Sequence, residues 1–124
     1  MKSYIEIEKK KDEYNKKYDK LLQENPSDDD TLLIYSDWLD LLGEFLTWNI
    51  TSYAEKIGFD LSKEHDKLFP FTDEAKKEML ISEEEATHRL SVLEREIASN
   101  EKLSKDHMKL LKNEADILRW MLED

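Results

Sequence analysis

Hydrophobic residues recur every three to four positions along most of the chain, which is the spacing of one face of an α-helix. Over residues 2–24 this spacing predicts a helix with a narrow apolar seam, interrupted at the turn where Lys11 lies. The seam consists of Tyr4, Ile7, Tyr14, Tyr18 and Leu21. Pro26 ends this helix, because proline lacks an N–H and disfavours helical geometry in the residue before it.

The second predicted helix covers residues 29–57 and has a much wider apolar face. Ser27 or Asp28 can cap its N-terminus, and Gly58 followed by Phe59 is typical of a left-handed C-terminal cap. On a helical wheel the apolar face covers about 200°. It is formed by Ile34, Tyr35, Trp38, Leu39, Leu41, Leu42, Phe45, Leu46, Trp48, Ile50, Tyr53 and Ile57. The opposite strip is polar and consists of Asp37, Asp40, Glu44, Thr47, Thr51 and Glu55.

The remaining chain predicts a connector followed by further helices. Residues 59–72 show no clear period and are interpreted as the connector. Helices are expected over residues 73–81, 83–99 and 105–122. The break between the first two rests on a Ser-x-x-Glu capping-box spacing that begins at Ser82, and one continuous helix is the alternative.

Together these elements predict an all-α fold, an antiparallel helical bundle of four to five helices built from two helical hairpins. The first hairpin covers residues 2–58, and a single domain is expected over residues 1–124. Short turns favour antiparallel neighbours, and a chain of this length can form one core. With only two glycines and two prolines, the chain has few turn residues for a multi-stranded sheet.

The charge of the chain limits the partners that it can bind. Thirty acidic and nineteen basic residues give a net charge of -11, which repels a phosphate backbone, so no direct binding to nucleic acid is expected. The same charge favours a protein partner with a basic surface, including a surface that normally holds nucleic acid. No long apolar stretch is present, so we expect no membrane partner and interpret the chain as a complete, mature cytoplasmic protein.

Several kinds of chemistry are excluded by the residue types. The chain has no cysteine, which excludes disulfides, thiolate catalysis and cysteine-ligated zinc. Gly43 and Gly58 are its only glycines, so a phosphate-binding glycine loop cannot be formed. His65, His88 and His107 lie on different segments and are interpreted as solvated surface residues. We therefore expect no cofactor, no metal and no catalytic residue.

One segment of the last predicted helix resembles part of an enzyme family. Residues 114–120, with the sequence Glu-Ala-Asp-Ile-Leu-Arg-Trp, are similar to the second metal-binding helix of the all-helical MazG-type nucleotide pyrophosphatases. That family pairs Glu-x-x-Asp on this helix with Glu-Glu-x-x-Glu on another to hold magnesium. Here Asn113 occupies the position three before Asp116. The nearest counterpart of the other motif is Asp37, Asp40 and Glu44. The resemblance implies a magnesium-dependent pyrophosphatase as an alternative function.

The second predicted helix carries the strongest functional signal. Residues 26–60 contain eight acidic residues and one basic residue, which is most of the chain's negative excess. Its apolar face has two interpretations: either neighbouring helices bury it, or part of it stays exposed and meets a partner or a second copy of the chain. On the second interpretation the partner-binding residues are Asp37, Asp40, Glu44, Trp38, Trp48, Tyr53 and Glu55.

Two polar residues within apolar faces are also open to two interpretations each. Lys11 either lays its aliphatic stem along the seam with its ammonium group in water, or pairs with an acid of the second helix. Asn49 either forms a buried hydrogen bond that sets the register of the helices, or lies at an uncovered edge.

The preferred hypothesis is a non-enzymatic interaction module that inhibits or neutralises a protein with a basic surface. In size, charge and lack of catalytic motifs the chain is similar to immunity proteins, antitoxins and phage anti-defence inhibitors, including anti-CRISPR and DNA-mimic proteins. Asp37, Asp40 and Glu44 on successive turns place carboxylates roughly 5–6 Å apart, near the spacing needed to occupy a phosphate-binding groove. A structural homodimer that buries the apolar face is the alternative from a different class.

Overall fold

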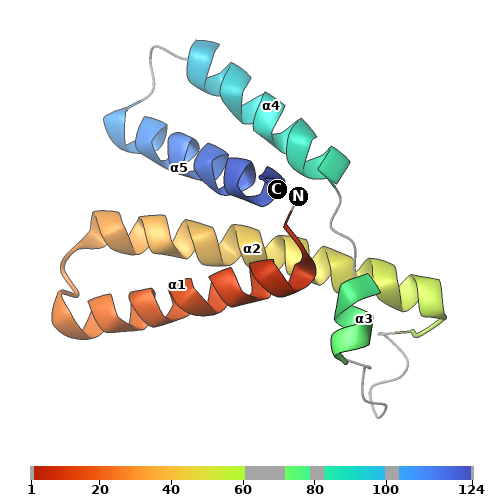
Figure 1. Cartoon of the computed structure of the whole chain (residues 1–124). Coiled ribbons are helices and arrows are strands. Elements are labelled where there is room, and N and C mark those ends of the chain that lie inside the picture. The colour runs from red at the N-terminus through yellow and green to blue at the C-terminus, as the bar shows by residue number, and fades with distance from the viewer. Residues whose placement is uncertain (1, 61–71, 79–82, 100–103, 124) are drawn as a thin grey trace.

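The computed structural model describes residues 2–60, 72–78, 83–99 and 104–123, and all regular structure in these ranges is helical. The helices are α1 (Tyr4–Glu24), α2 (Asp29–Ile57), α3 (Asp73–Glu78), α4 (Glu83–Ser99) and α5 (Lys105–Leu122). α1 and α2 form one antiparallel hairpin, α4 and α5 form the second, and α5 packs on α2 so that the hairpins stack (Figure 1). The predicted all-α fold of two helical hairpins is therefore confirmed.

Local capping explains where the helices begin. Ser3, Asp28 and Ser104 each accept a hydrogen bond from the backbone N–H three residues later, at 3.2 Å in all three caps. Thr72 does the same for α3 at 3.1 Å. These side chains satisfy N–H groups that have no partner within the helix. Of the two predicted caps of α2, Asp28 is therefore the one that the structure uses, and Ser27 is not.

The C-terminus of α2 is closed by a Schellman motif, as predicted. Gly58 adopts a left-handed conformation with φ of 74°. The N–H of Phe59 donates to the carbonyl of Ala54 at 2.8 Å, and the N–H of Gly58 donates to the carbonyl of Glu55 at 3.2 Å. These bonds satisfy carbonyl groups that the helix leaves open and turn the chain away from the α2 axis.

One hydrophobic core draws on all five described helices. The largest side chains that are fully buried are Ile7 of α1, Leu42 and Phe45 of α2, and Ile117, Leu118 and Met121 of α5. Ala75 of α3 and Ala86 of α4 complete it with small side chains. α2 packs on both α1 and α5, and the residues of its wide apolar face that become fully buried are Leu42, Phe45 and Leu46. Most of the others are partly buried, as the first interpretation expects, while Trp48 and Ile57 stay exposed.

Aromatic rings join the two hairpins near the middle of the bundle. Tyr14 of α1 stacks on Trp38 of α2, with ring centroids 4.4 Å apart and planes 7° apart. Trp38 in turn meets Trp120 of α5 edge-on at 6.0 Å. The two ends of the described chain also meet, because the N–H of Lys2 donates to the carbonyl of Met121 at 2.8 Å (Figure 1).

The predicted boundaries of the last helix, residues 105–122, match the structure at both ends, and α4 is helical throughout the predicted range 83–99. The helix predicted over residues 73–81 is described as far as Glu78, and its end, the break at Ser82 and residues 61–71 of the connector lie outside the described residues. His65 lies outside them too. Within the described ranges, no helix combines the length and apolar character that crossing a membrane requires.

Candidate functional site

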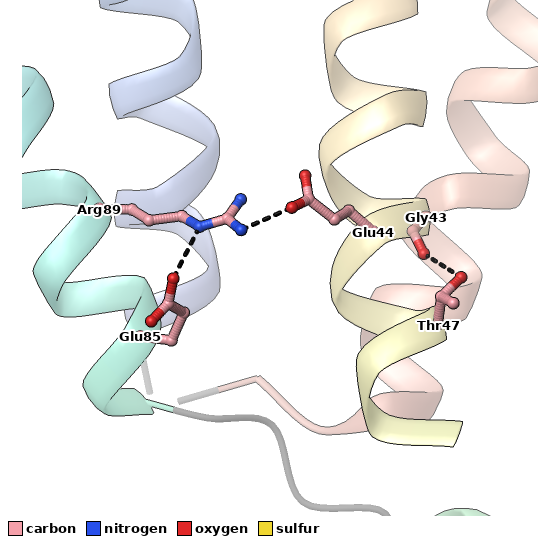
Figure 2. Close-up of polar contacts among 5 residues, drawn as sticks. All are labelled: Gly43, Glu44, Thr47, Glu85 and Arg89. Carbon is pink, nitrogen blue, oxygen red and sulfur yellow. Dashed lines mark hydrogen bonds and ion pairs between the residues drawn. The ribbon is translucent and has the colours of Figure 1, made fainter. Parts of the chain in front are cut away.

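One exposed face of α2 forms what we call the α2 ridge, consisting of Asp40, Glu44, Thr47, Thr51 and Glu55. The two threonine hydroxyls donate to the backbone carbonyls four residues earlier, at 2.9 Å for Thr47 and 3.0 Å for Thr51. Figure 2 shows the first of these bonds, to the carbonyl of Gly43. The two threonines are uncharged, so the carboxylates of Asp40, Glu44 and Glu55 supply the charge of the α2 ridge.

Asp37 is less exposed than the residues of the α2 ridge. The prediction that it lies on the solvated strip of α2 is therefore wrong. Its Oδ2 atom is buried and has no hydrogen-bond partner among the described residues. Burial raises the pKa of the Asp37 carboxyl, a hydrogen bond with Asn113 of α5 opposes that rise, and the charge of Asp40 adds to it. Asn113 also donates to the carbonyl of Ile34 at 3.2 Å. Asp37 lies at the side of the strip that faces α5, and that contact removes it partly from water.

Glu44 is exposed but is not a free charge. Arg89 of α4 donates one hydrogen bond to Glu44 and a second, at 3.1 Å, to Glu85 on its own helix (Figure 2). The bond from Arg89 is the main reason that the pKa of Glu44 is lowered. The guanidinium carbon also lies 5.2 Å from the ring centroid of Phe45 and 5.8 Å from that of Trp48. This arginine therefore ties α4 to α2 through charge and through aromatic contact.

The three aromatic residues nominated for partner binding differ in exposure. Trp38 lies within the aromatic contacts between the hairpins, and Tyr53 is partly buried and packs against the core. These two residues are therefore only partly exposed. Trp48 is 45% exposed, and the structure adds Leu33 and Ile57, at 51% and 43%, as exposed apolar residues of α2 that the prediction did not single out.

A pocket lies between α2, α4 and α5, with a volume of about 270 Å³. Its lining is mostly apolar and includes one acid, Glu114 of α5. The lining residues are Leu41, His88, Arg89, Val92, Leu93, Glu114 and Leu118. Burial is the main cause of a raised pKa at Glu114, and the charges of Asp37 and Glu96 raise it further. Sequence reasoning missed this pocket, because its residues come from three helices and only the packing brings them together.

Two acids of the pyrophosphatase resemblance are held in ion pairs. Asp116 pairs with Arg119 at 3.1 Å, and Glu44 pairs with Arg89. Asp37 and Asn113 are brought together, but one of this pair is an amide. Over the described ranges, no group of three or more histidine or acidic side chains is arranged to hold a metal ion.

The structure favours one of the two interpretations of Lys11 and excludes one of the two for Asn49. The Cε and Nζ atoms of Lys11 lie 3.6 and 3.7 Å from the point where a Cβ on Gly43 would be. The stem of Lys11 thus crosses α2 where α2 has no side chain, which favours the interpretation as an aliphatic contact. Asn49 is only 4% exposed, so it does not lie at an uncovered edge, yet its Nδ2 has no partner among the described residues.

The chain matches no protein-family model, and no curated protein or solved structure matches it significantly.

Proposed function

We propose that this chain is a non-enzymatic interaction module that binds a protein with a basic surface and thereby inhibits or neutralises it. The observation that carries the proposal is the concentration of negative charge on exposed positions of α2. Residues 26–60 hold eight acidic residues and one basic residue. The exposed acids of α2 are Asp29, Asp30, Asp40, Glu44 and Glu55. They are spread over about 40 Å of helix, given a rise of 1.5 Å per residue.

Charge of one sign along a rigid helix attracts a surface of opposite charge and orients it during association. Helices of both hairpins supply that rigidity, because α2 is packed between α1 and α5. A basic surface that normally holds nucleic acid presents rows of lysine and arginine. Such a surface suits a row of carboxylates, and occupying it would block its normal ligand.

Trp48 supports a protein partner rather than a purely solvated helix. It is 45% exposed and lies beside the ion pair of Glu44 and Arg89. Tryptophan and arginine are enriched among the residues that contribute most to protein interfaces, and charged rims commonly surround them. The proposal therefore places Trp48 within the contact area and the carboxylates of the α2 ridge around it.

The kind of interaction protein is proposed by analogy with known classes of small inhibitors. A small acidic helical module with these features is similar to immunity-type proteins and to phage anti-defence inhibitors, among them anti-CRISPR and DNA-mimic proteins. We place the chain in this group because its exposed charge is organised along one helix. The host and the partner would be identified by capture.

The test is a pull-down from nuclease-treated host lysate at low and high salt. The variant Asp40→Lys/Glu55→Lys reverses two exposed charges of the α2 ridge, and the matched control Asp12→Lys/Asp19→Lys reverses two exposed charges of α1. We expect the wild type and the control to capture the same basic protein at low salt. The α2 variant should lose it, and high salt should weaken it.

Two results would count against the proposal. Equal capture by both variants would mean that the α2 ridge is not the contact surface. Equal loss in both would mean that only net charge matters. Far-UV circular dichroism of each variant confirms that the helices are intact before capture is compared.

A homodimer is the second candidate, and the exposed apolar residues of α2 favour it. Leu33, Trp48 and Ile57 are each more than 40% exposed. If Trp48 meets a second copy, light scattering should show a dimer that Trp48→Ser dissociates. A monomer at high concentration would remove this candidate.

A further inference from the structure

The pocket between α2, α4 and α5 combines an apolar wall with one partly desolvated carboxylate. Leu41 comes from α2, Val92 and Leu93 from α4, and Leu118 from α5, while Glu114 supplies the carboxylate. Val92 is 36% exposed, so the α4 side of the pocket reaches the molecular surface. A ligand that fits this lining has an apolar body and a polar end.

The charge of Arg89, which also lines the pocket, is already offset. Its guanidinium bonds to Glu44 on α2 and to Glu85 on α4 (Figure 2). His88 is the other lining residue that can carry a positive charge, and its side chain is exposed. Neither of these two lining residues therefore forms an ion pair with Glu114.

Neighbouring acids repel the negative charge of Glu114. The charges of Asp37 and Glu96 add to burial in raising the pKa of Glu114, while His107 and Arg89 oppose the rise. The Oδ2 atom of Asp37 is buried without a hydrogen-bond partner among the described residues. Like charges that are partly removed from water destabilise each other, and a cation bound to Glu114 would offset part of that cost.

We propose that this pocket receives one arginine or lysine side chain of the partner. The methylene groups of that side chain lie against Leu41, Leu93 and Leu118, and its cation bonds to Glu114. Arginine and lysine bury their aliphatic stems along apolar surfaces in this way, and a bond between two charged groups is stronger than a neutral one. The inference rests on the proposed function, since it names the part of a basic partner that the chain recognises.

Small probes test the pocket without the partner. The full chain is titrated with n-butylguanidinium or n-butylammonium, and the shifts of backbone amides in α4 and α5 are followed by NMR. Guanidinium and ammonium ions without a stem, and n-butanol without a charge, are the matched probes. We expect saturable shifts around the pocket for the butyl cations only. The tighter of the two identifies whether arginine or lysine is preferred.

Two variants separate charge from shape. Glu114→Gln keeps the size of the side chain and should weaken binding of the butyl cations about tenfold, which is the effect of losing a charge-assisted bond of about 1.4 kcal/mol. Asp116→Asn removes an exposed charge two residues away on the same helix and should leave binding unchanged. Binding should also weaken as the pH falls and Glu114 becomes protonated.

The proposal is overturned if the butyl cations cause no saturable shifts at the pocket, or if n-butanol binds as well and Glu114→Gln changes nothing. Because these probes replace the partner, their failure overturns only the pocket assignment. Failure of the α2 charge-reversal pull-down overturns the proposed function instead.

Discussion

At the scale of single residues, the contact between α2 and α5 holds two carboxylates that water solvates only in part. Burial is the main cause of the raised pKa of Asp37 and of Glu114, and the charge of Asp37 raises the pKa of Glu114 further. An acid with a raised pKa binds a proton more readily in the folded state than in the unfolded state. Its unfavourable effect is therefore absent below the unfolded-state pKa and develops as the pH rises through the folded-state pKa.

The substitution Asp37→Asn tests this coupling. We expect the pKa of Glu114 to fall, because one of the charges that raises it is gone. At pH 7 the variant should be more stable than the wild type, and this gain should disappear at about pH 3, below the unfolded-state pKa of both acids. NMR titration of the Glu114 side chain and urea denaturation at both pH values measure the two effects.

Asp19→Asn is the control, because Asp19 is an exposed acid of α1. It should give no gain that depends on pH in this way. If Asp37→Asn instead destabilises the protein at pH 7, the bond between Asp37 and Asn113 outweighs the cost of burying the charge.

At the scale of elements, one of the two glycines lies within α2 and the other caps its C-terminus. Substitution by alanine should have opposite effects on stability at these two positions. Gly58 has φ of 74°, so Gly58→Ala should cost about 1 kcal/mol of stability through backbone strain alone, because a Cβ there would meet nothing within 4 Å. Gly43 lies within the helix, where alanine is favoured over glycine by about 0.8–1.0 kcal/mol. The added Cβ would lie 3.6 Å from Lys11 Cε, an ordinary contact.

We therefore expect Gly43→Ala to raise the free energy of unfolding and Gly58→Ala to lower it, both measured by urea denaturation. Gly58→Asn should restore part of the loss, because asparagine tolerates the left-handed conformation better than alanine. A stabilising Gly58→Ala would contradict the Schellman motif.

The attachment of α4 to α2 depends on Arg89. Glu44→Gln removes one charged partner of an exposed pair and should cost less than about 1 kcal/mol. Arg89→Ala should cost more, because it also uncovers the rings of Phe45 and Trp48. Arg89→Lys should not restore the loss, since lysine lacks the planar fork that reaches both Glu44 and Glu85.

Hydrogen exchange provides the readout for this attachment. In Arg89→Ala, amide protection should fall in α4 and change little in α1. If protection in α4 is unaffected, the helix is held by its contact with α5 alone.

At the scale of the whole molecule, the two hairpins share one core and the two ends of the described chain are hydrogen-bonded. We therefore expect the protein to unfold as one cooperative unit. Met121 is 0% exposed, belongs to the core, and its carbonyl accepts the N–H of Lys2. Met121→Ala should therefore cost about 2–5 kcal/mol, as for other large buried side chains. Met108→Ala, at a partly buried position near the other end of α5, should cost less.

Cooperativity is checked by following urea unfolding with tryptophan fluorescence and with far-UV circular dichroism. The two midpoints should coincide in the wild type and shift together in Met121→Ala. Separate transitions would mean that the two hairpins unfold independently.

Local signals in the sequence predict much of the fold. Gly58, Ser104 and the turn at Pro26 mark helix ends through bonds and steric effects that reach only a few residues along the chain. The periodic apolar positions predict the helices themselves, and short turns predict the hairpins. The wide apolar face of α2 likewise predicts a central helix, although Trp48 remains 45% exposed.

The sequence by itself determined the helices, most of their ends, the two hairpins and the excess of negative charge on α2, because each depends on neighbouring residues or on simple counts. Only the tertiary structure decided that Asp37 is partly buried while Asp40 is exposed, and that Glu44 meets Arg89, forty-five residues away. It also decided that Glu114 lines a pocket. The physical reason is that burial and ion pairing depend on which helix covers which side of another, and helical periodicity does not specify that.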